Sequence, residues 1–435
     1  MHDGSSWGYF ISPADAAHAL PIESEESLSS VRLSHRLSDV FCHPFCGRRL
    51  YLCGWLRSKC DLLVGLWCLV PLQKTFFAKK EALLIMKKAL FMLNALSDYF
   101  LQCLIALQET QRYEITVIRW PKKSEAPYEF VYPKDMSIHE RKELNDPELM
   151  CLAQELSPDF IFVSGWRDKG YLKIAKAFKD SSTVVTMSMD NHWNGHLKQR
   201  AATLLFPWTI GPLFDHIWVP GKLQAQYARR LGFSSENIHR GMYVANSTIY
   251  QPAEPPGPTN HSKTLVCIAR YTSSKGLEDL WNAFEDFVND GHPDWQLKCM
   301  GTGENFDQRV IHPNIQHIGF VQPADVPEHV KGATAFVLPS HFEPWGVVVQ
   351  EMALMGFPLI CSDAVGARTA FVRPRENGFV FPAGDSVALK QALVTLAELD
   401  QPQWLQWSQK SRELAETISH QGWVETIDKM LCHRP

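Results

Sequence analysis

The sequence predicts an α/β protein with two doubly wound, parallel-sheet domains. Short apolar runs typical of buried strands alternate with helical stretches in both halves of the 435-residue chain. A segment rich in proline, residues 251–260, separates the two halves and reads as a linker. Strands that alternate with helices favour parallel sheets covered by helices on both faces. The length suits two or three domains, and 45% hydrophobic with 21% charged residues suits a globular protein.

The expected elements follow from the period of the apolar residues. In the first half, strands are expected at residues 88–93, 113–118, 160–164, 183–187 and 216–219. Helices are expected at residues 97–109 and 169–178 between these strands and at 223–231 after the last of them. In the second half, strands are expected at residues 264–269, 296–300, 315–318, 335–338 and 358–361, and helices at 277–288, 347–355 and 387–399. These elements give a first domain over residues 86–257 and a second over residues 262–402.

Residues 1–85 have no clean period of either kind and form an irregular N-terminal extension. Met86 is followed by two lysines and an apolar run, as if a protein began there on a buried strand. We therefore expect residues 1–85 to be a disordered extension or the result of a misassigned start. A membrane-docking or partner-binding extension is the alternative. The spacing of Cys42, His43, Cys46 and Cys53 lacks the paired Cys-x2-Cys knuckles of structural zinc sites, so no metal site is predicted.

Composition and the search for targeting signals indicate where the protein is located and which partners are not expected. The start of the chain has no basic region followed by an apolar run, as a secretory signal would. The most apolar window, residues 62–72, is far shorter than a membrane span. The expected location is therefore cytoplasmic. A formal net charge of −4 gives no reason to expect a nucleic-acid partner.

The segment from Pro339 to Glu351 is the most informative part of the chain. It follows an apolar strand and leads into a helix, with Glu343 in the loop and Glu351 on the helix. The first N–H groups of a helix are unpaired and lie at its positive end, which suits a phosphate. Carboxylates beside them suit the hydroxyl groups of a sugar. One segment thus offers groups for both halves of a sugar nucleotide.

Two cations follow the first strand of the second domain. Arg270 and Lys275 lie in the loop after residues 264–269, and Gly276 precedes the next helix. In a parallel sheet such loops lie where ligands bind, and two cations there can hold a diphosphate and stabilise the charge that grows when it leaves. Gly301 and Gly303 follow the next strand. A single Gly-x-Gly is a weak signal, because it also fits a tight turn.

These motifs together resemble the donor-binding domain of GT-B-fold glycosyltransferases, in particular the retaining group numbered family 4, or glycosyl transferases group 1. The resemblance covers roughly residues 262–400. It rests on Arg270, on Lys275-Gly276, on Glu343 and Glu351 with seven residues between them, and on Pro339-Ser340 before that pair. Gly356-Phe357-Pro358 and Asn377-Gly378 also match the family. The implied fold is two Rossmann-like domains that face one another across a cleft, with a C-terminal helix in residues 403–435 that packs back on the first domain.

The resemblance implies roles for single residues. Arg270 and Lys275 would bind the donor diphosphate, and Glu343 would contact the transferred sugar. Glu351 would hold the ribose hydroxyls. Further donor contacts are expected around the loops and the helix start, from Gly301, Gly303, Trp345, Gly346, Val347 and Val348. No cofactor and no metal is implied, and the sequence has no Asp-x-Asp pair.

The first domain, expected to hold the acceptor, matches the family less well. The loop after its first strand, Asn94 to Tyr99, has none of the glycines that family members often carry there. Either Asp190 or His192 fits the polar position that contacts the reacting sugar, and the sequence does not choose between them. Trp166 and Trp193 are expected to stack on the acceptor sugar or, alternatively, to be core residues.

The function implied is transfer of a sugar from a nucleoside-diphosphate sugar, with retention of configuration, to a cell-envelope glycan or glycolipid. Polysaccharide or lipopolysaccharide synthesis is the expected setting, with peripheral association at the inner face of the cytoplasmic membrane. One alternative is a sugar-nucleotide epimerase of the same architecture. Another is a non-catalytic relative that only binds sugar nucleotides.

Overall fold

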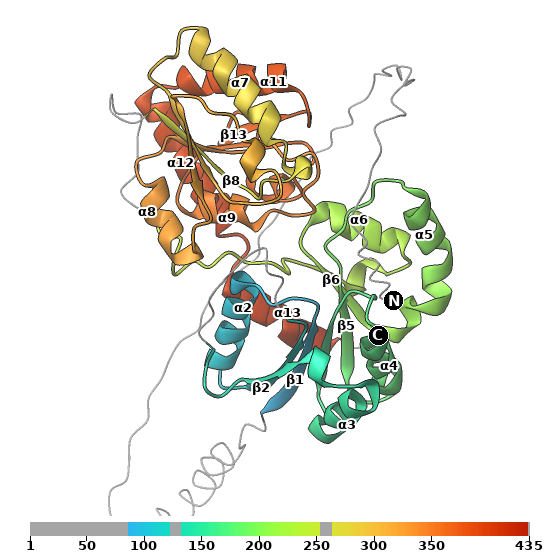
Figure 1. Ribbon diagram of the computed structural model, residues 1–435. Helices are drawn as coiled ribbons and strands as arrows, with labels where there is room; N and C mark the ends of the chain where they lie inside the picture. The colour runs from blue at the N-terminus through green and yellow to red at the C-terminus, as the bar shows by residue number, and fades with distance from the viewer. Residues whose placement is uncertain (1–85, 122–131, 253–262, 434–435) are drawn as a thin grey trace, which may run out of the picture. The chain divides into compact units, whose positions relative to one another are not determined.

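The computed structural model describes residues 86–121, 132–252 and 263–433. The hypotheses about residues 1–85, including the misassigned start and the cysteines weighed as zinc ligands, lie outside these residues. Within them, the chain forms two parallel sheets with helices on their faces (Figure 1). The predicted fold class is therefore confirmed.

The first sheet has seven parallel strands in the order β3-β2-β1-β4-β5-β6-β7. Its central strands are apolar because both faces of the sheet are covered: the last five residues of β1 are all buried. The strands are β1 (Lys87–Leu93), β2 (Tyr113–Arg119), β3 (Ser137–Glu140), β4 (Phe160–Ser164), β5 (Val184–Ser188), β6 (His216–Val219) and β7 (Ile238–Arg240). The helices are α2 (Asp98–Glu109), α3 (Asp146–Leu156), α4 (Lys169–Phe178), α5 (Leu197–Thr209) and α6 (Lys222–Arg230).

The second sheet has six parallel strands in the order β10-β9-β8-β11-β12-β13. The strands are β8 (Thr264–Ile268), β9 (Gln296–Met300), β10 (Ile315–Gly319), β11 (Ala335–Leu338), β12 (Leu359–Ser362) and β13 (Gly378–Phe381). Around them lie α7 (Leu277–Asn289), α8 (Val326–Val330), α9 (Val347–Leu354), α10 (Arg368–Phe371) and α11 (Ser386–Ala397). Helices α7 and α11 lie side by side on one face (Figure 1). In both sheets the chain order reverses beside the first strand, and ligands of such sheets bind at that point, beyond the carboxyl ends of the strands.

The C-terminal stretch is two helices rather than one, α12 (Gln401–Ala415) and α13 (His420–Cys432). Trp404 and Trp407 on α12 are buried in the second domain, where the Trp404 indole N–H donates to Thr334 O at 2.9 Å. Trp423 on α13 is buried against Phe91 and Phe100 of the first domain (α13 lies beside α2 in Figure 1). All three tryptophans are therefore packing residues.

Strand β3 and helix α3 are among the elements that were not predicted from the spacing of apolar residues. Strand β3 is short and only partly buried, with an exposed serine and a charged end, so its residues carry little period-two signal. Helix α3 begins with a capping box between Asn145 and Glu148, a signature that its sequence does contain. None of the helices in the described ranges is both long and apolar enough to cross a bilayer.

Candidate active site

The loop between β11 and α9 carries the predicted carboxylates, and its shape depends on Gly346. This residue has φ 91° and stands immediately before the first helical residue, Val347. A β-carbon added at Gly346 would lie 3.0 Å from Glu343 Cγ and would be strained in this left-handed conformation. Gly346 therefore lets the chain turn sharply into α9. The first N–H groups of α9, those of Val347 and Val348, lie next to the Glu343 loop. They are the groups predicted to donate hydrogen bonds to a phosphate.

Lys275 and Glu343 form an ion pair between two neighbouring loops. Both side chains are largely buried: that of Lys275 is 10% exposed and that of Glu343 is 16% exposed. The two loops are also tied by their backbones, since His341 N–H and Phe342 N–H both donate to Ser274 O, at 2.9 and 3.1 Å. The structure thus brings together two residues predicted from separate motifs, 68 positions apart.

Arg270 lies beyond the carboxyl end of β8 with an exposed side chain. The loop that contains it is held by the loop after β9, because Tyr271 N–H donates to Thr302 O at 3.1 Å and Asn305 N–H to Tyr271 O at 2.9 Å. Gly301 and Gly303 allow this approach. A β-carbon at Gly301 would collide with Ala269 O, and one at Gly303 would lie 2.5 Å from Tyr271 O. Both glycines are required where two backbones meet.

Trp345 lies in the core rather than on the surface of the loop. Its side chain is 2% exposed, and its ring packs at 5.9 Å from that of Phe371. A β-carbon at Gly221, just before α6, would collide with the indole ring. The buried indole Nε1 has no hydrogen-bond partner within the described ranges. The ring face is therefore occupied by protein, and the donor contact expected of Trp345 stays a prediction.

Glu351 is half-buried on α9, and its surroundings favour the protonated carboxyl group. Burial raises the pKa of Glu351 to about 8, and the nearby charge of Asp98 adds to this effect. A hydrogen bond with Tyr250 acts in the opposite direction. The Glu351 carboxyl group therefore keeps its proton to a higher pH than an exposed glutamate does, and in the protonated form it can donate a hydrogen bond as well as accept one.

This raised pKa predicts how stability depends on pH. Between the ordinary pKa of 4.5 and about 8, the folded protein keeps a proton on Glu351 that the unfolded chain loses. Stability contributed by that proton is complete below pH 4.5 and is lost as the pH rises through 8. Relative to Glu351→Gln, we expect the wild-type free energy of unfolding to fall by on the order of 2–4 kcal/mol from pH 5 to pH 9. Urea unfolding of both proteins at several pH values measures it, and parallel pH profiles would contradict it.

Asp190 and His192 both lie close to the Glu343 loop. Asp190 accepts a hydrogen bond from the Tyr243 hydroxyl at 3.4 Å. Burial raises the pKa of Asp190, and the charge of Glu343 also acts upward. The His192 ring packs 5.7 Å from the Phe342 ring, and burial lowers the pKa of His192. His192 Nδ1 is buried and has no hydrogen-bond partner among the residues described.

Trp166 and Trp193 both pack on the core of the first domain. The Trp166 ring meets the buried Phe206 ring edge to face at 5.2 Å. The Trp193 ring lies 5.6 Å from Tyr227, and the Arg230 guanidinium stands over it at 4.7 Å. Both tryptophans therefore make the contacts expected of core residues, and their role in acceptor binding stays a prediction.

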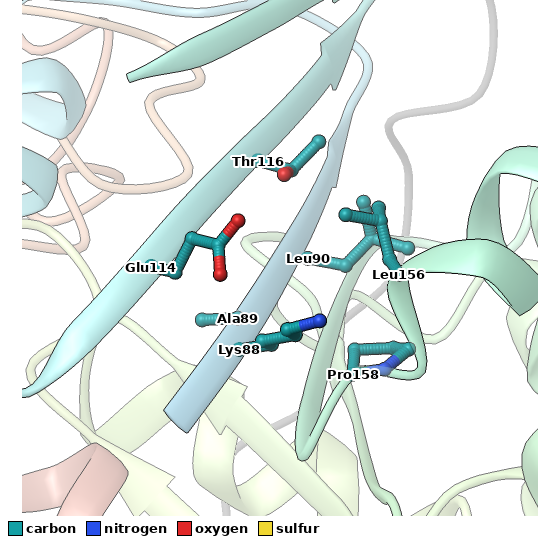
Figure 2. Close-up of a pocket in the computed structure, with 7 residues that line it drawn as sticks. All are labelled: Lys88, Ala89, Leu90, Glu114, Thr116, Leu156 and Pro158. Atoms are coloured by element: carbon teal, nitrogen blue, oxygen red, sulfur yellow. The ribbon is translucent and has the colours of Figure 1, made fainter. Parts of the chain in front are cut away.

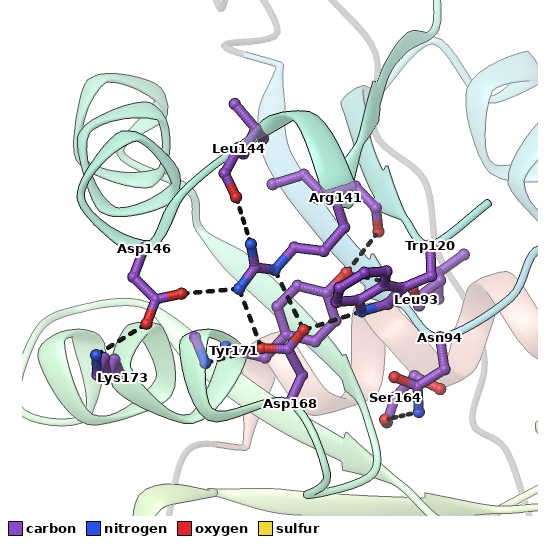
Figure 3. A network of polar contacts seen from close by, with 12 residues as sticks. Leu93, Asn94, Trp120, Arg141, Leu144, Asp146, Ser164, Asp168, Tyr171 and Lys173 are labelled. Carbon is purple, nitrogen blue, oxygen red and sulfur yellow. Dashed lines mark hydrogen bonds and ion pairs between the residues drawn. The ribbon is translucent and has the colours of Figure 1, made fainter. Parts of the chain in front are cut away.

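A polar network that the sequence did not indicate lies at the carboxyl ends of β1 to β4 (Figure 3). The buried Arg141 guanidinium donates to Asp168 at 3.2 Å and to Asp146 at 2.8 Å, and also to Leu144 O. Asp168 caps α4 and accepts from the Trp120 indole N–H at 2.9 Å. The polar groups of Arg141 are satisfied by protein, so this network fixes the edge of the first sheet. An isolated Arg among polar residues carries no pattern that reveals such a role.

A shallow indentation lies at the end of the first sheet where its strands begin, opposite to the end that carries the polar network (Figure 2). Lys88 and Leu90 line it from β1, Glu114 and Thr116 from β2, and Leu156 and Pro158 from the end of α3 and beyond. It is too small to hold a water molecule. These residues stand at the amino ends of the strands, away from the edge where parallel sheets bind ligands.

Comparison with known protein families matches the second domain. Residues 262–399 match the model of the family "Glycosyl transferases group 1". An uncharacterized glycosyltransferase of Haemophilus influenzae is 27% identical over 170 residues, which are 38% of this chain and 47% of that protein. Phosphatidyl-myo-inositol mannosyltransferase of Mycobacterium leprae is 29% identical over 176 residues, 39% of this chain and 46% of that protein. The chain thus matches about half the length of these relatives.

Solved structures match both domains at low sequence identity. Anabaena HepE, solved in complex with UDP and glucose, has a TM-score of 0.60 at 16% identity and covers 80% of this chain and 99% of its own. Sucrose-phosphate synthase of Thermosynechococcus elongatus has a TM-score of 0.60 at 14% identity, covering 79% of this chain and 98% of its own. Residues 262–399 therefore form a glycosyl transferases group 1 domain within a chain that has the GT-B fold.

Proposed function

We propose that this protein is a retaining glycosyltransferase of family 4 that moves a sugar from a nucleoside-diphosphate sugar to an acceptor without a metal ion. The observation that carries the proposal is the buried Lys275–Glu343 pair beside the start of α9. A cation and unpaired helix N–H groups suit a diphosphate, and the adjacent carboxylate suits sugar hydroxyls. The group 1 match of the same residues supports this reading.

The proposed chemistry is displacement of the diphosphate at the anomeric carbon. The bond from the anomeric carbon to the diphosphate oxygen breaks, and the acceptor oxygen forms a bond to that carbon on the same face. The acceptor's proton passes to the departing phosphate oxygen, so no protein base is required. Negative charge grows on the diphosphate as it leaves. Arg270, Lys275 and the N–H groups of Val347 and Val348 stabilise it, and they supply the transition-state contacts that accelerate transfer.

Glu343 and His192 are the residues that we assign to the transferred sugar. Glu343 projects from the same loop as the helix start and needs only to exchange part of its contact with Lys275 for a sugar hydroxyl. His192 is preferred over Asp190, because Asp190 already accepts from Tyr243 whereas His192 Nδ1 is buried without a partner in the described part of the chain. A ligand hydroxyl that donates to this nitrogen would remove an unsatisfied group.

The relatives suggest the class of acceptor. Besides the mannosyltransferase of M. leprae, the lipopolysaccharide 1,6-galactosyltransferase of Escherichia coli is 26% identical over 174 residues, 35% of this chain and 47% of that protein. We infer that the acceptor is a glycan or lipid-linked molecule of the cell envelope, reached at the inner face of the cytoplasmic membrane. Because HepE was solved with UDP, a UDP-sugar is the first donor to test.

Donor binding can be tested by thermal shift of the full chain with UDP-, GDP-, ADP- and dTDP-sugars. A donor at about 100 times its dissociation constant stabilises the folded protein by about 2.7 kcal/mol, or a Tm increase on the order of 5 °C. One nucleotide class should stand out, and Lys275→Ala should remove the shift. Lys263→Ala, whose exposed side chain pairs with exposed Asp294, is the matched control and should keep it.

The outcome of that screen separates three results. A selective shift with release of free nucleoside diphosphate in the presence of acceptor extract supports transfer. A selective shift without release would instead favour a protein that only binds the donor. No shift with any nucleotide sugar would contradict the proposed site itself.

A further inference from the structure

Helix α5 presents an apolar stripe to the surface of the first domain. Among the described residues, four of the nine exposed large hydrophobic side chains lie on this one helix. They are Leu197, Leu204, Leu205 and Trp208, which are 82%, 74%, 63% and 86% exposed. Exposed apolar residues scattered singly are ordinary, but a contiguous group on one element indicates an interaction surface.

The stripe follows from the spacing of these residues. At about 100° per residue, Leu197, Leu204, Leu205 and Trp208 fall within an arc of about 100°. Phe206 falls roughly opposite and is 2% exposed, packed against the rings of Trp166 and Phe233. The helix is thus anchored by one face and leaves an organised apolar face uncovered within the described structure.

The charged residues of α5 itself have one sign. In the same projection down the helix axis, Lys198 and Arg200 fall on the two sides of the apolar stripe, at about 100° and about −60° from Leu197. Both side chains are exposed. Residues 191–214 contain no aspartate or glutamate. An apolar stripe bordered by cations, with a tryptophan at its end, suits the boundary between anionic headgroups and acyl chains.

We propose that α5 docks the protein on an anionic lipid surface through Leu197, Leu204, Leu205 and Trp208. Lys198 and Arg200 contact the headgroups. The amino end of the helix is tied to the His192 loop, because the Gln199 side-chain amide donates to His192 O and Gln199 Oε1 accepts from Asn194 N–H, both at 2.8 Å. Docking therefore holds the segment that we assign to the reacting sugar close to the lipid surface.

The inference deepens the proposed function, since a lipid-linked acceptor would lie at such a surface, but its test requires no turnover. Purified full chain is floated with vesicles of phosphatidylglycerol and phosphatidylethanolamine, and with vesicles of phosphatidylcholine alone. We expect binding to the anionic vesicles that weakens as salt rises. Leu204→Ser with Trp208→Ser should weaken it by about tenfold or more, because two exposed apolar anchors are lost.

Two further variants sharpen the test. Ile311→Ser with Val387→Ser removes equally exposed side chains, 83% and 76%, from the second domain and should leave binding unchanged. Lys198→Gln with Arg200→Gln should weaken binding to anionic vesicles by about tenfold at low salt. The Leu204/Trp208 and Ile311/Val387 variants change exposed apolar side chains, so their thermal unfolding should match the wild type. Arg200 Nε donates to Gly195 O at 2.9 Å, so the thermal unfolding of the Lys198/Arg200 variant is measured alongside its binding.

Three results would overturn the inference. The first is a full chain that does not float with anionic vesicles. The second is equal binding by the α5 variant and the Ile311/Val387 control. The third is a dimer of the wild type, seen by light scattering, that becomes a monomer in the α5 variant, because the stripe would then be an interface between copies. None of these results bears on the donor thermal-shift screen, which tests the proposed site separately.

Discussion

Lys275→Ala is expected to reduce transfer from the preferred donor by two orders of magnitude or more. Lys275 is one of the cations assigned to the leaving diphosphate, and loss of a single contact made in the transition state costs a factor of about 100 to 1,000. The variant also leaves Glu343 without its ion-pair partner. Glu351→Ala should have an effect of similar size if Glu351 holds the nucleotide ribose.

Initial rates of nucleoside-diphosphate release, with and without acceptor, measure both effects. Lys263→Ala is the control for a lysine of the same domain, since its pair with Asp294 is exposed on both sides. Lys275→Arg keeps the charge but not the compact ammonium group, so it should recover part of the rate. Wild-type rates in both Lys275→Ala and Glu351→Ala would remove these residues from the active site.

Arg141→Ala is expected to lower the free energy of unfolding by about 3–5 kcal/mol, which is typical of breaking a buried ion pair by removing one partner. The side chains of Arg141 and Asp168 are 9% and 6% exposed, so the carboxylate of Asp168 would remain buried without its cation. The guanidinium also lies over the Trp120 ring at 5.5 Å, and that packing is lost too. At 2–4 °C per kcal/mol, Tm should fall by about 10 °C.

The matched control is Lys173→Ala, which removes one of the two cations that pair with Asp146 in the same network. The Lys173 side chain is 63% exposed, so the loss should stay within about 1 kcal/mol. Denaturant unfolding of the two variants compares them directly. Equal stabilities would mean that the network in Figure 3 does not fix the sheet edge as inferred.

The sequence predicted the fold because the buried strands of parallel sheets are nearly continuous apolar runs. Strand β11 is buried at all four positions, and the periodic helices on either side leave little choice of architecture. Strand β3, with no buried residue, was missed because its pairing with β2 is made by the backbone, which the sequence does not display. The break between α12 and α13 was also missed, although Ser419 accepts from Gly422 N–H there and caps the second helix.

The sequence by itself determined which residues carry charge and where loops follow strands, so it selected Arg270, Lys275, Glu343 and Glu351. Only the tertiary structure decided what surrounds them. It paired Lys275 with Glu343, turned the Trp345 ring into the core and placed Glu351 where its pKa rises to about 8. It also showed that, among the residues that the structure describes, none covers the apolar stripe of α5. Burial and pairing depend on contacts between distant segments, whereas strand and helix patterns depend on neighbours in the chain, and one sequence records only the latter directly.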